Sequence, residues 1–406
     1  MIWRRLLFVA AAVAVVLAAP AAEAQKHYDP GAGDTEIKIG NTNPYSGPAS
    51  SYGVIGKTET AFFNMINDRS GINGRKINFI SYDDGYSPPK TVEQVRKLVE
   101  NDGVLLLFNT LGTPTNTAIQ KYLNQKKVPQ LFVATGATKW GDPKHFPWTI
   151  GWQPNYQSEG RIYAAYILQH HPAGKIAVLY QNDDYGKDYV KGLKDGLGEK
   201  AKSMIVAEAP YETTDPTVDS QVVNLKASGA DIFFNVTIPK FAAQAIRKAA
   251  EIDWKPAHFL NSVSNSVGGV LQPAGFENTK GILSSAYFKD PTDPSWQNDQ
   301  GYKDWVAFMD KYYSDGDKTN AFTVYAYSVA QGLMQVLEQC GDNLTRENIM
   351  REAANLKDFE PPMFLPGIKA NTSPTDFFPV KQMQMARFNG ERWELFGPII
   401  RGEIHD

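Results

Sequence analysis

Two short loops rich in threonine and glycine follow predicted strands and could hold a polar or anionic group. The first loop, residues 109–115, follows the apolar run 104–108, and the second, residues 134–136, follows the run 129–133. Continuous apolar runs of this kind are typical of strands buried on both faces of a parallel sheet. Open α/β sheets bind ligands at the carboxyl ends of their strands. We therefore expect a binding site at these loops.

The first loop also predicts the start of a helix. Thr113 is of the type that serves as an N-cap, Pro114 suits the first helical position, and apolar residues then recur at helical spacing from 118 to 123. Free N–H groups and hydroxyls at a helix start suit a carboxylate. Ordinary capping would explain either loop alone, but two such loops on neighbouring strands favour a site.

No combination of residues predicts catalysis. Residues 53–58 are similar to a phosphate-binding loop, but Ser51 stands where its first glycine should be. The six histidines show no metal-ligand spacing, and there is no Gly-x-Ser-x-Gly nucleophile motif. The acidic pairs at 83–84 and 183–184 could bind a metal or act as acid and base, but we interpret them as loop carboxylates. We expect neither an enzyme nor a bound cofactor or metal.

Composition and the first residues indicate an exported globular protein. The 406 residues are 42% apolar and 21% charged, with a net charge of −3, which permits two domains and does not indicate a nucleic-acid partner. Residues 1–24 have the pattern of a signal peptide, with a basic start, an apolar run and an Ala-Glu-Ala cleavage site. The single cysteine, Cys340, excludes an intramolecular disulfide and fits an apolar packing position.

The rest of the chain repeats one α/β plan. Predicted strands alternate with helical patterns up to residue 150, a break follows at 151–154, and the alternation starts again at 158. Such alternation is typical of doubly wound parallel sheets. We expect an α/β fold with one lobe at residues 25–152 plus 289–360 and a second at 153–288 plus 361–406. The later helical patterns are at 301–313, 320–339 and 345–355, and short strands are expected at 364–368, 380–388 and 393–396.

Several segments resemble the periplasmic substrate-binding proteins of ABC importers of the branched-chain amino acid type. They are residues 37–40, 44–48 and 52–53, residues 66–76 with the turn Gly-Ile-Asn-Gly-Arg-Lys, residues 82–84, and residues 184–188. The resemblance covers nearly the whole mature chain. It implies the type I fold, with two lobes joined by several crossings that hinge about a cleft. It also implies a periplasmic monomer that delivers a small-molecule ligand to an inner-membrane permease.

The resemblance implies a ligand site as well. The first lobe would hold the head group with its two threonine-rich loops and an aromatic ring, and the second lobe would close over it with a tyrosine and strand-exit loops. The candidate ligand-binding residues are Tyr52, Thr113, Pro114, Thr115, Ala134, Thr135, Gly136, Trp152, Tyr185, Thr237, Ser262, Val263 and Phe288.

One departure from the family pattern bears on the ligand. Amino-acid-binding members neutralise the ligand ammonium with a carboxylate from the loop after residue 260, but here no acid lies between Asp253 and Glu277. Burying an unpaired ammonium is costly. Aromatic residues are available to sandwich a flat apolar body, so we favour an aromatic acid of the benzoate or phenylpropanoid kind. A branched-chain amino acid, a small amide, and a ligand-sensing partner of a membrane receptor remain alternatives. The candidate sandwich residues are Trp152, Tyr156, Tyr185 and Phe288.

Overall fold

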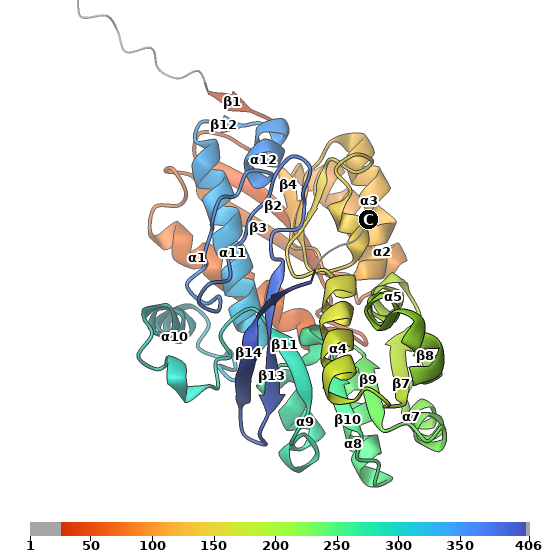
Figure 1. Ribbon diagram of the computed structural model, residues 1–406. Helices are drawn as coiled ribbons and strands as arrows, with labels where there is room; N and C mark the ends of the chain where they lie inside the picture. Colours follow the sequence, from red (N-terminus) through yellow and green to blue (C-terminus); the bar gives the residue numbers. More distant parts are fainter. Residues whose placement is uncertain (1–25, 403–406) are drawn as a thin grey trace, which may run out of the picture.

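The computed structural model describes residues 26–402 and has two α/β lobes, each built on its own sheet (Figure 1). The expected signal peptide lies outside the described residues. The first sheet has five parallel strands in the order β3-β2-β4-β5-β6. From β2 the chain adds β3 on one side and then β4, β5 and β6 on the other. The point where the strand order changes sides is where open α/β sheets bind ligands. The strands are β2 (Glu36–Asn43), β3 (Lys76–Asp83), β4 (Leu106–Phe108), β5 (Gln130–Val133) and β6 (Thr149–Gly151).

The first lobe contains helices from two distant parts of the chain. The early ones are η1 (Ser50–Tyr52), α1 (Gly53–Asp68), α2 (Pro88–Arg96), η2 (Lys97–Asp102), α3 (Thr113–Lys126) and η3 (Thr138–Gly141). The late ones are α10 (Gln300–Tyr312), α11 (Ala321–Cys340) and α12 (Arg346–Ala353). The blue α11 packs against the orange α1 (Figure 1). A short parallel pair, β1 (His27–Tyr28) with β12 (Asn343–Leu344), also ties the late segment to the start of the described chain.

The second sheet has seven strands in the order β14-β13-β11-β10-β9-β7-β8. Its first five strands along the chain are parallel, and β13 and β14 add an antiparallel hairpin. The strands are β7 (Ile176–Gln181), β8 (Ile205–Tyr211), β9 (Ile232–Val236), β10 (Ala257–Leu260), β11 (Leu283–Ala286), β13 (Gln382–Phe388) and β14 (Trp393–Arg401). The helices are α4 (Tyr156–His170), α5 (Asp184–Leu197), α6 (Ala201–Met204), α7 (Asp219–Ala227), α8 (Pro239–Glu251) and α9 (Gln272–Ala274).

The chain passes between the lobes after β6, after β11 and before β13. The expected α/β fold with two lobes and several crossings is therefore confirmed. Within residues 26–402, no helix combines the length and the apolar character needed to span a bilayer.

Some local predictions were wrong. Residues 364–368 do not form a strand, because Pro366 and Gly367 make a turn in which Gly367 has φ +90°, and only an isolated bridge joins Phe364 to Phe288. Strand β4 begins at Leu106 rather than at Val104. The carbonyls of residues 104 and 105 instead accept hydrogen bonds from the Arg346 guanidinium, each at 2.9 Å.

Candidate ligand-binding site

A cavity lies where the two lobes meet. Its empty space is about 660 Å³, part of it open to solvent. Eight of the lining residues are aromatic, and no lining residue carries a formal charge. The first-lobe part of the lining is Tyr52, Ile55, Tyr86, Leu111, Gly112, Thr113, Ala134, Phe322 and Tyr325. The other part is Gln153, Tyr156, Tyr185, Ile238, Ser262, Val263, Asn265, Tyr287 and Phe288.

The start of α3 forms the polar end of the first-lobe wall. Gly112 is its N-cap, with φ +102°, so the expected N-cap at Thr113 was one residue late. Thr113 is the first helical residue, and its side chain makes no capping bond. The Asn116 N–H donates to the Gly112 carbonyl at 3.1 Å, and Pro114 has no N–H. The N–H groups of Thr113 and Thr115 donate to no other described residue, which leaves a helix N-terminus with unpaired donors.

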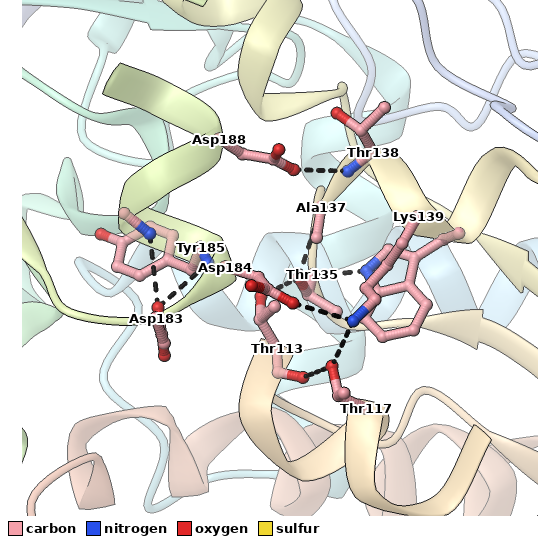
Figure 2. Close-up of polar contacts among 12 residues, drawn as sticks. Thr113, Thr117, Thr135, Ala137, Thr138, Lys139, Asp183, Asp184, Tyr185 and Asp188 are labelled. Carbon is pink, nitrogen blue, oxygen red and sulfur yellow. Dashed lines mark hydrogen bonds and ion pairs between the residues drawn. The ribbon is translucent and has the colours of Figure 1, made fainter. Parts of the chain in front are cut away.

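The threonine hydroxyls hold the two loops together. The Thr113 and Thr135 hydroxyl oxygens are 2.5 Å apart (Figure 2). Thr135 Oγ1 also accepts from the Ala137 N–H and from Trp140 Nε1, each at 3.3 Å. The Thr115 hydroxyl donates to the Leu111 and Gly112 carbonyls, as is common for threonine inside a first helical turn. Thr135 and Thr115 therefore shape the loops, and Thr113 is the threonine that lines the cavity.

Tyrosines dominate the side walls. Tyr156 contacts the Tyr185 ring edge-on, with ring centres 5.3 Å apart. The Tyr52 hydroxyl donates to the Val263 carbonyl at 2.8 Å and so joins the two lobes across the cavity. The Tyr185 hydroxyl has no hydrogen-bond partner among the described residues although it is buried. Burial raises the pKa of Tyr185 well above its usual value, so its hydroxyl stays protonated and can donate to a ligand.

A buried carboxylate fixes the loop that closes the second-lobe side. Glu159, on α4, accepts from the Ser262 N–H, the Ser262 hydroxyl, and the hydroxyls of Tyr163 and Tyr189, each at 2.7 Å. These bonds position η5 (Ser262–Ser264) at the cavity wall. Burial raises the pKa of Glu159, while the four hydrogen bonds lower it. Glu159 itself is not part of the lining.

Two polar contacts bridge the lobes beside the cavity. Lys139 of η3 pairs with Asp184 at 2.8 Å, and the Thr138 N–H donates to Asp188 Oδ2 at 2.6 Å (Figure 2). Both acids lie on α5, whereas η3 follows the last residue of β5 in the first lobe. We call this set of four residues the η3–α5 contact. It holds the two lobes together at the rim of the site.

Part of the predicted site lines the cavity. Its members come from both lobes and are Tyr52, Thr113, Ala134, Tyr185, Ser262, Val263 and Phe288. The other candidates lie outside the lining and are Pro114, Thr115, Thr135, Gly136, Trp152 and Thr237. Trp152 is fully buried and packs against Phe132, with ring centres 4.9 Å apart, rather than against the cavity. The Thr237 hydroxyl donates to Asn235 Oδ1 at 2.7 Å.

Sequence reasoning missed several lining residues. Tyr86 follows the acidic pair at the end of β3, so the strand-exit rule could have found it. Phe322 and Tyr325 lie in the first turns of α11, more than 200 residues after Tyr86. Their position shows only in the fold, because α11 returns to pack on α1.

The acidic pairs have structural roles. Asp183 caps α5 by accepting from the N–H groups of Tyr185 and Gly186. Burial raises the pKa of Asp83, but hydrogen bonds from Ser46, Gly85 and Lys90 outweigh this effect and lower it to about 2. Among the described residues, no group of three or more His, Cys, Asp or Glu side chains could hold a metal ion.

Comparisons with known proteins agree with this architecture. The chain is 25% identical over 320 residues to the Leu/Ile/Val-binding protein homolog 1 of Brucella suis, covering 77% of this chain and 81% of that protein. Its fold matches a branched chain amino acid ABC transporter from Thermus thermophilus with bound valine, with a TM-score of 0.80, 13% identity, and coverage of 90% of this chain and 97% of that chain.

A fatty acid ABC transporter substrate-binding protein from Thermomonospora curvata matches with a TM-score of 0.74 and 21% identity, covering 93% of this chain and 95% of that chain. A model of the periplasmic binding protein family matches residues 36–392. The resemblance drawn from the sequence is confirmed, and the chain belongs to the periplasmic binding protein family.

Proposed function

We propose that this protein captures an aromatic carboxylic acid, of the benzoate or phenylpropanoid kind, between its lobes. It would pass that acid to the permease of an ABC importer in the inner membrane. The observation that carries the proposal is the lining of the cavity, which is uncharged and rich in aromatic rings, with a helix N-terminus at one end. In the same proposal, residues 1–24 direct export, and the mature chain acts in the periplasm as a monomer.

Each part of such a ligand has a chemical counterpart in the lining. The positive end of α3, with the Thr113 N–H and hydroxyl, suits the carboxylate. The aromatic body would lie among the rings of Tyr52, Tyr156 and Phe288. Tyr185 offers a hydroxyl without a partner. Contacts from both lobes would favour the closed arrangement, so ligand binding shifts the population toward it.

A branched-chain amino acid is the second candidate, because the Brucella suis relative is named for Leu/Ile/Val binding and the Thermus thermophilus structure holds valine. An α-ammonium would need a carboxylate at the lining. The carboxylate that reaches the Ser262 loop is Glu159, and it is already engaged by four donors. Fold neighbours with amino-acid and fatty-acid names have similar TM-scores, so they do not separate the ligand classes. A ligand-sensing role beside a membrane receptor would use the same cavity.

The first test is a thermal-shift panel on ligand-free residues 25–406 with benzoate, cinnamate, 4-hydroxycinnamate, leucine, valine and a small amide. A ligand present at 100 times its Kd stabilises the folded state by about 2.7 kcal/mol. We expect a rise in Tm with the aromatic acids and none with leucine or valine. A rise with leucine or valine alone would refute the proposed ligand class.

Tyr185→Phe tests the assignment of the cavity. The change removes the unpaired hydroxyl and keeps the ring contacts with Tyr156. A neutral hydrogen bond contributes about 0.5–1.5 kcal/mol, so the Kd for the bound acid should rise about 2- to 10-fold in titration calorimetry. The matched control is Tyr312→Phe on α10, which lies outside the lining and should leave the Kd unchanged. Equal effects of the two changes would show that Tyr185 makes no polar contact with the ligand.

A further inference from the structure

A second, smaller cavity adjoins the first and shares part of its wall. It has about 470 Å³ of empty space, part of it open to solvent. Ser262, Asn265, Tyr287 and Phe288 line both cavities. We call the smaller cavity the annex. Because four residues line both spaces, the annex lies directly beside the main cavity.

The annex differs from the main cavity in its chemistry. Its lining includes two carboxylates, Asp290 and Asp293, and two indole rings, Trp296 and Trp393. The Trp393 indole N–H donates to the Asn265 carbonyl at 2.8 Å, which fixes that ring beside the shared wall. The main cavity is lined by uncharged residues. The two spaces therefore suit different ends of one molecule.

Asp290 is the carboxylate with spare capacity. It is partly buried, and its Oδ1 accepts from both the N–H and the hydroxyl of Thr292, the N–H at 2.8 Å. No described residue donates to its Oδ2. The neighbouring cation, Lys289, is engaged elsewhere, since it donates to Asp299 and to the Pro362 carbonyl, each at 2.7 Å. A carboxylate oxygen thus remains available to a donor in the annex.

The pKa of Asp290 is consistent with a carboxylate that lacks a full set of hydrogen-bond donors. Burial raises the pKa of Asp290 to about 6, although the hydrogen bonds from Thr292 lower it and the charge of Asp293 adds to the rise. Asp293 is itself engaged through Oδ1, which accepts from the Ser295 N–H at 2.9 Å. At neutral pH Asp290 is a carboxylate whose charge the surrounding residues compensate poorly, so a hydrogen-bond donor from a ligand would stabilise it.

We propose that the annex receives the far end of an elongated ligand, and that this end carries a hydrogen-bond donor for Asp290, such as a phenolic hydroxyl or an ammonium group. This inference rests on the proposed function, which places the carboxylate end of the ligand in the main cavity. The rings of Trp296 and Trp393 would flank the donor group. The ligand class is then an aromatic acid with a donor substituent opposite its carboxylate.

The test compares probes that differ only at the far end: 4-hydroxycinnamate, 4-methoxycinnamate and 4-(aminomethyl)cinnamate. Titration calorimetry is run on residues 25–406 at pH 7.5. Hydrogen bonds to a charged group contribute about 1.5–3 kcal/mol, so at least one donor-bearing probe should bind about 10-fold or more tightly than the methoxy probe. The hydroxyl and amino probes together show whether a neutral or a charged donor is preferred.

Asp290→Asn should remove this preference. Asparagine keeps Oδ1 as an acceptor for Thr292, while its amide replaces the free acceptor Oδ2 with a donor. In this variant, the Kd of the methoxy probe divided by the Kd of the donor-bearing probe should fall to about 1 or below. Asp315→Asn makes the same charge change on an exposed residue and should keep the wild-type ratio. Thermal melts of both variants show whether each is folded.

The outcomes separate the two proposals. Binding of all three cinnamates with equal affinity, or a ratio unchanged in Asp290→Asn, would overturn the annex proposal and leave the carboxylate site standing. Failure of every cinnamate to bind would refute the proposed function and the annex proposal with it.

Discussion

His258 shows how burial of a single residue can set the acid sensitivity of the protein. It lies on β10 and is 8% exposed, with Nε2 3.2 Å from Asn235 Nδ2 and its ring beside that of Phe233. Burial lowers the pKa of His258 from 6.5 to about 3. Because the folded state disfavours the charged form, this contribution to stability is present above pH 6.5 and is lost as the pH falls toward 3.

We therefore predict that His258→Gln flattens the acid side of the stability profile. The His258 contribution should make the free energy of unfolding of the wild type fall by about 2 kcal/mol between pH 7 and pH 5, and the variant should lack this part of the decrease. Urea unfolding at the two pH values measures the difference. Exposed His27→Gln is the control and should keep the wild-type decrease. A variant with the same decrease as the wild type would show that His258 is not responsible.

At the scale of elements, the turn into α3 is the feature that places the polar end of the site. Gly112 has φ +102°, and a Cβ at this position would lie 2.5 Å from Tyr86 Cε2 and 2.6 Å from Thr115 Oγ1. Both neighbours belong to the site: Tyr86 lines the cavity, and Thr115 lies in the first turn of the helix. The glycine therefore permits both the backbone conformation and the close approach of the tyrosine ring.

Gly112→Ala should weaken both folding and binding. The strained backbone and the displaced ring should lower the free energy of unfolding by about 1–3 kcal/mol and raise the Kd for the ligand more than about 10-fold. Gly103→Ala is the matched control, since Gly103 also has positive φ, at +66°, but a Cβ there meets no atom within 4 Å. It should lower stability by about 1 kcal/mol and leave the Kd unchanged. Denaturant unfolding and calorimetry give both quantities.

At the scale of the whole molecule, the η3–α5 contact couples the two lobes. The Lys139 and Asp184 side chains are 30% and 56% exposed, so their pairing is worth at most about 1 kcal/mol. The Thr138 bond to Asp188 adds a second bridge, and Asp188 Oδ1 also accepts from Gln157 at 2.9 Å. The Tyr52 bond to Val263 also joins the two lobes. Together these bonds hold the lobes in the arrangement that the structure shows.

Asp184→Lys should weaken the contact between the two lobes. Replacing attraction to Lys139 by repulsion should raise the ligand Kd about 2- to 5-fold at low salt, and less at high salt because exposed charges are screened. Small-angle scattering of the ligand-free variant should show a larger radius of gyration. The double variant Lys139→Asp with Asp184→Lys restores opposite charges and should recover most of the affinity. No recovery in the double variant would mean that the pairing is not what couples the lobes.

Local chemistry in the sequence predicted the alternation of strands and helices well, because strand and helix periodicities and turn residues act over short distances. The same short-range rules placed the loops of Thr113 and Ala134 at strand exits, and the family resemblance added Tyr185 and Ser262; all four residues line the cavity. They failed where neighbours far along the chain decide the outcome. At the start of β4, the Arg346 guanidinium binds the carbonyls of residues 104 and 105. The turn at Pro366 and Gly367, by contrast, is a local signal that the strand prediction for residues 364–368 overlooked.

The sequence by itself determined the α/β class, the two-lobed plan and the absence of an acid from the loop after residue 260. Only the tertiary structure decided which aromatic rings line the cavity. Trp152 and Tyr185 are both buried aromatic residues, yet one packs in the core and the other lines the cavity. Burial of apolar surface is favourable in the core and in a cavity wall, and it has no preferred direction. The sequence alone therefore cannot distinguish an aromatic residue of the core from one that lines a pocket. The return of α11, which packs on α1, brings the Tyr325 ring to the cavity wall.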